Sequence, residues 1–114
     1  MARKILIVDD NESNREELRE ILSENYEILE AENGQEALTI IKHYFRVISV
    51  ILLDIDMPVM DGYELLKQLN NHPIFAQIPS IVVTDNTEEE TEEQTLRMGA
   101  DIFIRVPYNQ NIIK

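Results

Sequence analysis

Residues 47–66 read VISVILLDIDMPVMDGYELL, and this stretch decides the fold because it joins a buried strand to a helix through a short acidic loop. Residues 47–53 are apolar apart from one serine and rich in β-branched side chains, which is typical of a strand inside a parallel sheet. Asp54 follows directly. Open α/β sheets bind ligands at the carboxyl ends of their strands, so Asp54 is a candidate functional residue, although a lone acid there is often a simple turn residue.

The following residues end the strand and begin a helix. Met57-Pro58 prevents the strand from continuing. Asp61 and Glu64 have the spacing of the N-cap and N3 residues of a capping box, so a helix is predicted over residues 62–70.

A second apolar run, Lys4–Val8, also ends in acids, Asp9 and Asp10. If the two strands are parallel neighbours, their carboxyl ends bring these acids to Asp54. Clustered carboxylates repel one another, so such a group usually indicates a bound cation. With oxygen ligands and no nearby His or Cys, Mg2+ or Mn2+ is favoured over zinc.

Strand-like runs and helix-like segments alternate along the whole chain. Strand-like runs occupy residues 4–8, 26–30, 47–53, 81–83 and 102–106, and helix-like segments occupy residues 11–23, 62–70, 87–98 and a segment that Asn33 caps. In the first helix, Leu18, Ile21 and Leu22 are predicted to face the core while Arg15 and its charged neighbours stay in solvent. This alternation predicts a single α/β domain with a doubly wound parallel sheet.

The predicted helix over residues 87–98 has well-marked ends and a weak middle. Thr87 and Glu90 form a capping-box pattern, and Gly99 is suited to end the helix. Several glutamates lie three and four residues apart, where like charges repel. A solvated helix face explains most of this pattern, and low local stability is the further expectation.

Composition limits the possible functions. A chain of 114 residues with 10 Lys+Arg, 22 Asp+Glu and a formal net charge of -12 is one domain that is not expected to bind nucleic acid directly. There is no cysteine and no long apolar run, which fits a cytoplasmic protein without a membrane segment. Residues 108–114 are too short for a stable further helix, so residues 1–114 are predicted to be part of a longer protein or a shortened domain, with any output domain beyond Lys114.

Several motifs together resemble the receiver domain of two-component response regulators. They are Asp9-Asp10, the sequence DIDMPVMDG at residues 54–62, Thr84 after a later strand, and residues 99–107 with their Gly-Ala-Asp start and final proline. The resemblance extends over nearly the whole chain. It implies a flavodoxin-like receiver fold with five strands in the order 2-1-3-4-5 and a shortened last helix.

The resemblance also implies a signalling domain of a phosphorelay rather than a classical enzyme. Such a domain takes a phosphoryl group from a histidine kinase or phosphotransfer protein and catalyses its own phosphorylation and dephosphorylation. By this pattern Asp54 is the phosphoacceptor, and Mg2+ neutralises charge. The implied metal ligands are Asp10, Asp54, the backbone carbonyl of Asp56 and, through water, Asp9. Thr84 is expected to bind the phosphoryl group, and Phe103 to change rotamer.

Two positions depart from the family pattern. Val106 stands where a lysine normally contacts the phosphoryl group, and Asp85 stands where a small residue is usual. Arg105 is one residue too early, and strand alternation points it to the opposite face unless a bulge intervenes. A pseudo-receiver that acts as a phosphorylation-independent interaction module therefore remains an alternative. A weaker one is a phosphatase of the haloacid dehalogenase type, suggested by the Asp-x-Asp sequence but opposed by Pro58 and the short chain.

Overall fold

Five parallel strands form the central sheet, in the order β2-β1-β3-β4-β5. The computed structural model describes residues 3–107. The strands are β1 (Lys4–Val8), β2 (Glu27–Ala31), β3 (Ile48–Leu53), β4 (Ser80–Thr84) and β5 (Ile102–Arg105). The predicted fold class and strand order are both confirmed, with strand boundaries shifted by no more than a residue or so from those expected.

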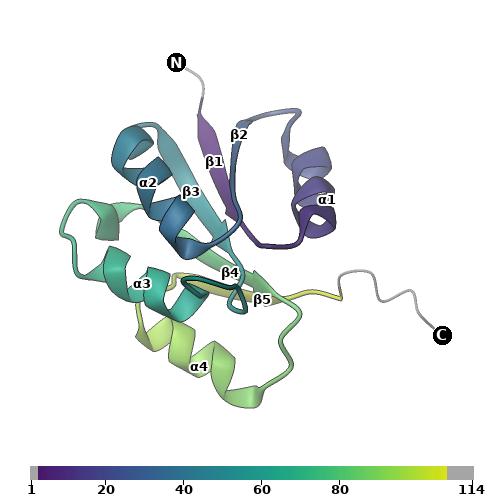
Figure 1. Cartoon of the computed structure of the whole chain (residues 1–114), viewed down its shortest axis with the longest axis vertical. Coiled ribbons are helices and arrows are strands. Elements are labelled where there is room, and N and C mark those ends of the chain that lie inside the picture. Colours follow the sequence, from purple (N-terminus) through teal and green to yellow (C-terminus); the bar gives the residue numbers. More distant parts are fainter. Residues whose placement is uncertain (1–2, 108–114) are drawn as a thin grey trace.

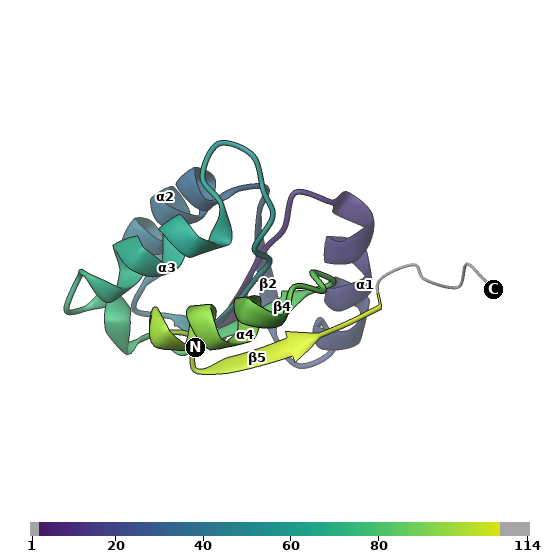
Figure 2. The ribbon, with the colours of Figure 1, turned by 90° about the horizontal axis from the view of Figure 1, so that it is seen from below.

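Helices cover both faces of the sheet (Figures 1 and 2). They are α1 (Glu12–Leu22), α2 (Gly34–Tyr44), α3 (Gly62–Asn70) and α4 (Glu89–Arg97), with a short 3-10 helix, η1 (Phe75–Gln77), in the predicted connector. Helix α1 packs on one face, and α2, α3 and α4 lie on the other. This arrangement leaves the carboxyl ends of the strands together at one edge of the sheet.

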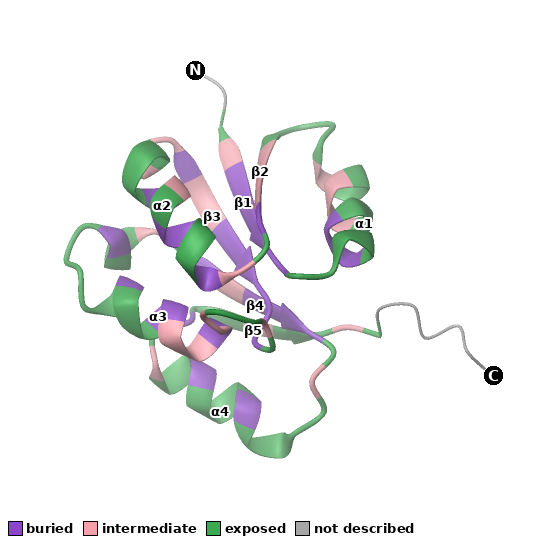
Figure 3. Cartoon of the chain, viewed as in Figure 1, coloured by how far each residue is buried: buried purple, intermediate pink, exposed green. Residues whose placement is uncertain are grey.

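Buried residues occupy the strands and parts of the helices (Figure 3), and their side chains form two clusters, one on each face of the sheet. The larger cluster joins α2 and α3 to the strands through Leu6, Ile51, Leu65 and other aliphatic residues. The smaller cluster consists of Ile5, Ile7, Leu52 and Val83, with partly buried side chains of α1 packed against it. Strands β1 and β3 are therefore covered on both faces, as the continuous apolar runs predict.

The predicted helix caps at Asn33 and Asp61 are confirmed. The side chain of Asn33 accepts the N–H of Glu36 at 2.8 Å, and that of Asp61 accepts the N–H of Glu64 at 2.9 Å. Gly62, which begins α3, lies so close to β3 that an added Cβ would be 2.3 Å from the carbonyl oxygen of Asp54. The glycine thus allows α3 to start directly beside the candidate acceptor.

Helix α1 differs from the prediction at two side chains. Arg15 was expected in solvent but is only 8% exposed, and its Nε donates to Glu30 of β2 at 2.9 Å. Ile21 was expected in the core but is 67% exposed. The helix turns a stripe containing Arg15, Leu18 and Leu22 toward the sheet, so Ile21 falls outside that stripe.

Helix α4 begins later than predicted, and its cap was assigned wrongly. It starts at Glu89, and Thr87 does not cap it. Instead, the side-chain oxygen of Asn86 accepts the N–H of Glu88 at 2.8 Å and the hydroxyl of Thr91 at 2.9 Å. The buried residues of α4 are Thr91 and Thr95 rather than its larger apolar side chains. Gly99 does end the helix region, with a φ of 114° that suits glycine.

Strand β5 forms the edge of the sheet beside β4. Ile102 and Ile104 pair with Ile81 and Val83, and they are 49% and 43% exposed on the face that carries α1. The expectation of an incomplete last helix concerns residues 108–114 and lies outside the described residues. None of the helices within residues 3–107 combines the length and the apolar character of a membrane span.

Candidate functional site

Three acidic side chains meet where β1 and β3 end. Asp9 and Asp10 follow β1, Asp54 follows β3, and the N–H of Asp54 donates to the carbonyl of Val8 at 2.9 Å. The carboxylates of the three acids each place an oxygen within 4.8 Å of the others. Parallel neighbouring strands bring their carboxyl ends to one edge, so the convergence follows from the strand order.

Asp54 is a buried acid whose charge is poorly solvated. It is 7% exposed. Burial raises its pKa from 3.8 to about 7, and the charges of Asp9 and Asp85 act in the same direction. The side chain of Thr84 and the N–H of Ile55 oppose this rise. Near neutral pH, the ionised form of Asp54 is therefore held in an unfavourable environment that an added positive charge would relieve.

Asp9 is buried as deeply, but the start of α1 holds it in place. Its Oδ1 accepts the N–H of Asn11 at 2.9 Å, and its Oδ2 accepts the side-chain amide of Asn14 at 3.2 Å. Burial raises the pKa of Asp9 above its ordinary value, and these hydrogen bonds limit the rise. Asp10, by contrast, is exposed.

The residues around the three acids fit a hard divalent cation. The acids offer carboxylate oxygens, which Mg2+ and Mn2+ prefer. Asn14, whose side-chain amide donates to Asp9, is buried, and its Oδ1 has no hydrogen-bond partner among the described residues. Native proteins satisfy nearly all such atoms. A divalent cation would provide the positive charge that the three acids lack.

Thr84, at the end of β4, lies beside the acids and is fully buried. Its Oγ1 accepts the N–H of Asn86 at 3.1 Å. The side-chain amide of Asn86 in turn donates to the exposed carboxylate of Asp56 at 3.0 Å. The role expected of Asp56 involves its backbone carbonyl, and that role stays a prediction. Asn86 was missed in the sequence, where the only signal was its place two residues after the strand.

The departures from the family pattern have clear positions. Val106 is partly buried and packs against the cluster on the α1 face, and its N–H donates to the carbonyl of Thr84 at 2.9 Å. Arg105 turns away from the acids. Its guanidinium donates to the carbonyls of Asn86 at 2.7 Å and Glu88 at 3.0 Å. Arg105, beside Phe103, and Val106 thus lie on opposite faces of the sheet, as strand alternation predicts.

The remaining two candidate residues lie at the margin of the site. Asp85 is exposed next to Thr84 and contributes negative charge near Asp54. Phe103 is half-buried against the larger core cluster, and the guanidinium of Arg105 lies over its ring, 4.9 Å from the centroid. The aromatic side chain is therefore in contact with the same arginine that binds the loop after β4.

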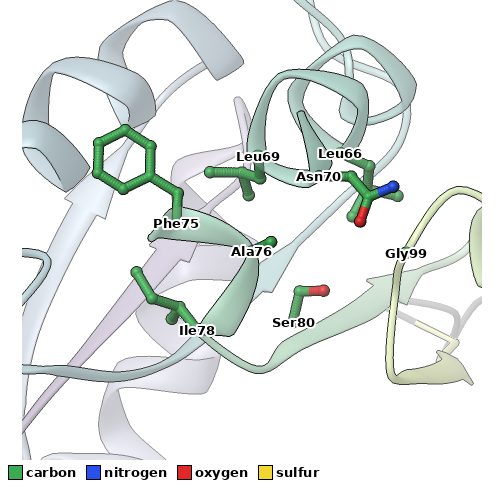
Figure 4. A pocket seen from close by; sticks show the side chains of 8 residues that line it. All are labelled: Leu66, Leu69, Asn70, Phe75, Ala76, Ile78, Ser80 and Gly99. Carbon is green, nitrogen blue, oxygen red and sulfur yellow. The ribbon is translucent and has the colours of Figure 1, made fainter. Parts of the chain in front are cut away.

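A separate small pocket lies near the amino end of β4 (Figure 4). Its lining residues are Leu66, Leu69, Asn70, Phe75, Ala76, Ile78, Ser80 and Gly99. The cavity has a volume of only about 10 Å³, which is room for about one water molecule. The acidic cluster at the carboxyl ends of the strands is the better candidate for chemistry.

The family model of the response regulator receiver domain matches residues 5–114. The chain belongs to this family. It is 39% identical to the chemotaxis protein CheY of Halobacterium salinarum, over 96% of this chain and 89% of that protein. It is 38% identical to the phosphate regulon transcriptional regulatory protein PhoB of Pseudomonas aeruginosa, over 96% of this chain and 47% of that protein.

A solved structure agrees with the family assignment. CheY from Borrelia burgdorferi, determined in a complex with CheX, BeF3 and magnesium, has a TM-score of 0.84 and is 31% identical, with 92% of this chain and 78% of that chain covered. Several curated relatives are much longer than this receiver domain, which spans under half of the transcriptional regulator. Receiver domains are signalling domains of two-component systems rather than classical enzymes, and membership in this family gives no support to the phosphatase alternative.

Proposed function

We propose that this receiver domain accepts a phosphoryl group on Asp54 from a phosphohistidine of a histidine kinase or phosphotransfer protein. The observation that carries the proposal is the buried Asp54 carboxylate within 4.8 Å of the Asp9 and Asp10 carboxylates. The all-oxygen cluster favours Mg2+, or Mn2+, as the bound ion. Asp10 and Asp54 are the proposed direct ligands, with the carbonyl of Asp56, and Asp9 acts through water.

The proposed reaction transfers the phosphoryl group between two nucleophiles. A carboxylate oxygen of Asp54 forms the new bond to phosphorus, the nitrogen–phosphorus bond breaks, and its electron pair returns to the histidine imidazole of the partner. The bound cation supplies positive charge that reduces repulsion between the acids and the incoming anion. The hydroxyl of Thr84 is the proposed donor to a phosphoryl oxygen. Burial of Asp54 keeps bulk water away from the acceptor.

A pseudo-receiver that binds a partner without phosphorylation is the second candidate. It is favoured by Val106, which packs against apolar side chains where the family has a cation, and by the exposed acid Asp85 at the site. Both features weaken the attraction for a phosphoryl anion. The intact cluster of three acids favours the first candidate.

Incubation with Mg2+ and acetyl phosphate, followed by intact mass measurement, separates the two candidates. A phosphorylated form that Asp54→Asn abolishes supports the proposal. Asp56→Asn is the matched control, because Asp56 has an exposed side chain and is proposed to act only through its carbonyl. If the native chain gains no phosphate with either Mg2+ or Mn2+, the result counts against the proposal and supports the pseudo-receiver candidate.

A further inference from the structure

Two polar side chains on the first turns of α1 are buried although most of that helix is exposed. Asn14 is 7% exposed and Arg15 is 8% exposed. Burying an arginine side chain is costly unless its charge is paired and its N–H groups have acceptors. The contacts that offset this cost therefore indicate what the residue does.

The contacts of Arg15 connect Asp9 to strand β2. Its Nη1 donates to the backbone carbonyl of Asp9 at 2.6 Å, and its Nε donates to the carboxylate of Glu30 at 2.9 Å. Arg19, one turn later, binds the other oxygen of Glu30. Burial opposes ionisation of Glu30, but the two arginines hold its pKa below the ordinary value, so it remains an anion that anchors both.

Asp9 is consequently held at three atoms. Arg15 binds its carbonyl oxygen, Asn14 binds Oδ2, and the N–H of Asn11 binds Oδ1. A carboxylate fixed in this way loses little conformational entropy when an ion arrives, and partners that orient ligands in metal sites commonly change affinity by about 10- to 100-fold.

We propose that Arg15 and Asn14 are positioning residues of the cation site, and that they set its affinity by fixing Asp9 between α1 and β2. This inference rests on the proposed function, because it takes the acidic cluster to bind Mg2+. The competing explanation is a purely structural ion pair that fastens α1 to β2. Arg19 distinguishes the two explanations, since Arg19 and Arg15 both bind Glu30, but the contact with Asp9 comes from Arg15.

The test compares Arg15→Gln with its matched control Arg19→Gln in a calorimetric Mg2+ titration, with unfolding measured separately without metal. Arg15→Gln is expected to weaken Mg2+ binding by roughly tenfold, and Arg19→Gln by less than about twofold, even where both lower stability. Asn14→Leu keeps Arg15 and is expected to weaken binding as well. Arg15→Lys, which can keep one donor to the Asp9 carbonyl, should recover part of the affinity.

Each result has a definite meaning. If the two glutamine variants change Mg2+ affinity equally, or Asn14→Leu binds as the native chain does, the positioning role is overturned and the ion pair is structural. A native chain that binds no Mg2+ at all would refute the cation site itself, and with it both the proposed function and this inference. If Arg15→Gln does not fold, Asn14→Leu alone decides, because its binding either falls or stays unchanged.

Discussion

Replacing Asp54 with asparagine should stabilise the metal-free chain, and increasingly so as the pH rises. The reason is that the folded chain holds the Asp54 carboxylate in a buried position beside other acids, where its pKa is about 7 instead of 3.8. The folded state therefore binds a proton more tightly than the unfolded state. Stability from this group is fully present below the unfolded pKa and is lost as the pH rises through about 7.

The size of the effect follows from this difference. Between pH 5 and pH 8, ionisation of Asp54 should lower the free energy of unfolding by about 2–3 kcal/mol relative to a chain in which the group does not titrate. Asp54→Asn keeps nearly the same shape and an oxygen for the N–H of Ile55, which now donates to the carboxylate at 2.7 Å. Relative to the native chain, the variant should therefore gain about 2–3 kcal/mol more unfolding free energy at pH 8 than at pH 5.

Urea unfolding followed by circular dichroism, with a chelator present, measures the unfolding free energies of the native chain and of Asp54→Asn at each pH. Asp56→Asn is the control, because it makes the same substitution at an exposed acid two residues away. Saturating Mg2+ should reduce the difference in unfolding free energy between the variant and the native chain at pH 8, since the ion stabilises the native chain and not the variant. A gain that is equal at the two pH values, or a loss at pH 8, would show that the environment of Asp54 does not disfavour its charge.

Three other outcomes are expected. Millimolar Mg2+ should raise the melting temperature of the native chain, and Asp10→Asn should remove most of that gain; equal gains in both would count against the cluster as the binding site. In hydrogen exchange, α4 should be less protected than α3, because α4 buries two threonines while α3 buries three leucines; equal protection contradicts this reasoning. Val106→Lys should raise the affinity for beryllofluoride roughly tenfold by adding a charge-assisted hydrogen bond, as NMR titration would show; an unchanged or lower affinity would mean that a lysine here does not reach the site.

The sequence was most informative where local chemistry decides the structure. The side chains of Asn33 and Asp61 cap their helices as predicted, since each cap needs only a residue three positions away. The apolar runs identified the strands, and the parallel direction of neighbouring strands predicted that Asp9 and Asp54 would meet. These inferences depend on short distances along the chain or on a general rule of handedness.

One error came from a contact between distant segments, and another from a choice between neighbouring residues. Arg15 was placed in solvent because helical periodicity treats a charged residue as exposed, and the periodicity cannot show that Glu30 lies opposite it in the sheet. The start of α4 was placed at Thr87 because Thr87 and Glu90 have capping-box spacing. The N-cap residue is Glu88 instead, and its N–H donates to the side chain of Asn86.

Arg105 connects the ring of Phe103 to the loop after β4. Its guanidinium lies over the ring of Phe103 and also donates to the carbonyls of Asn86 and Glu88. If the ring rotates, the arginine loses an exposed cation–π contact worth about 0.5–1 kcal/mol, and if the loop moves, the arginine loses its acceptors. The orientation of the ring and the position of the loop are thus thermodynamically linked. A substitution at position 105 should therefore weaken the effect that a movement of the loop after β4 has on a partner bound to the Phe103 face.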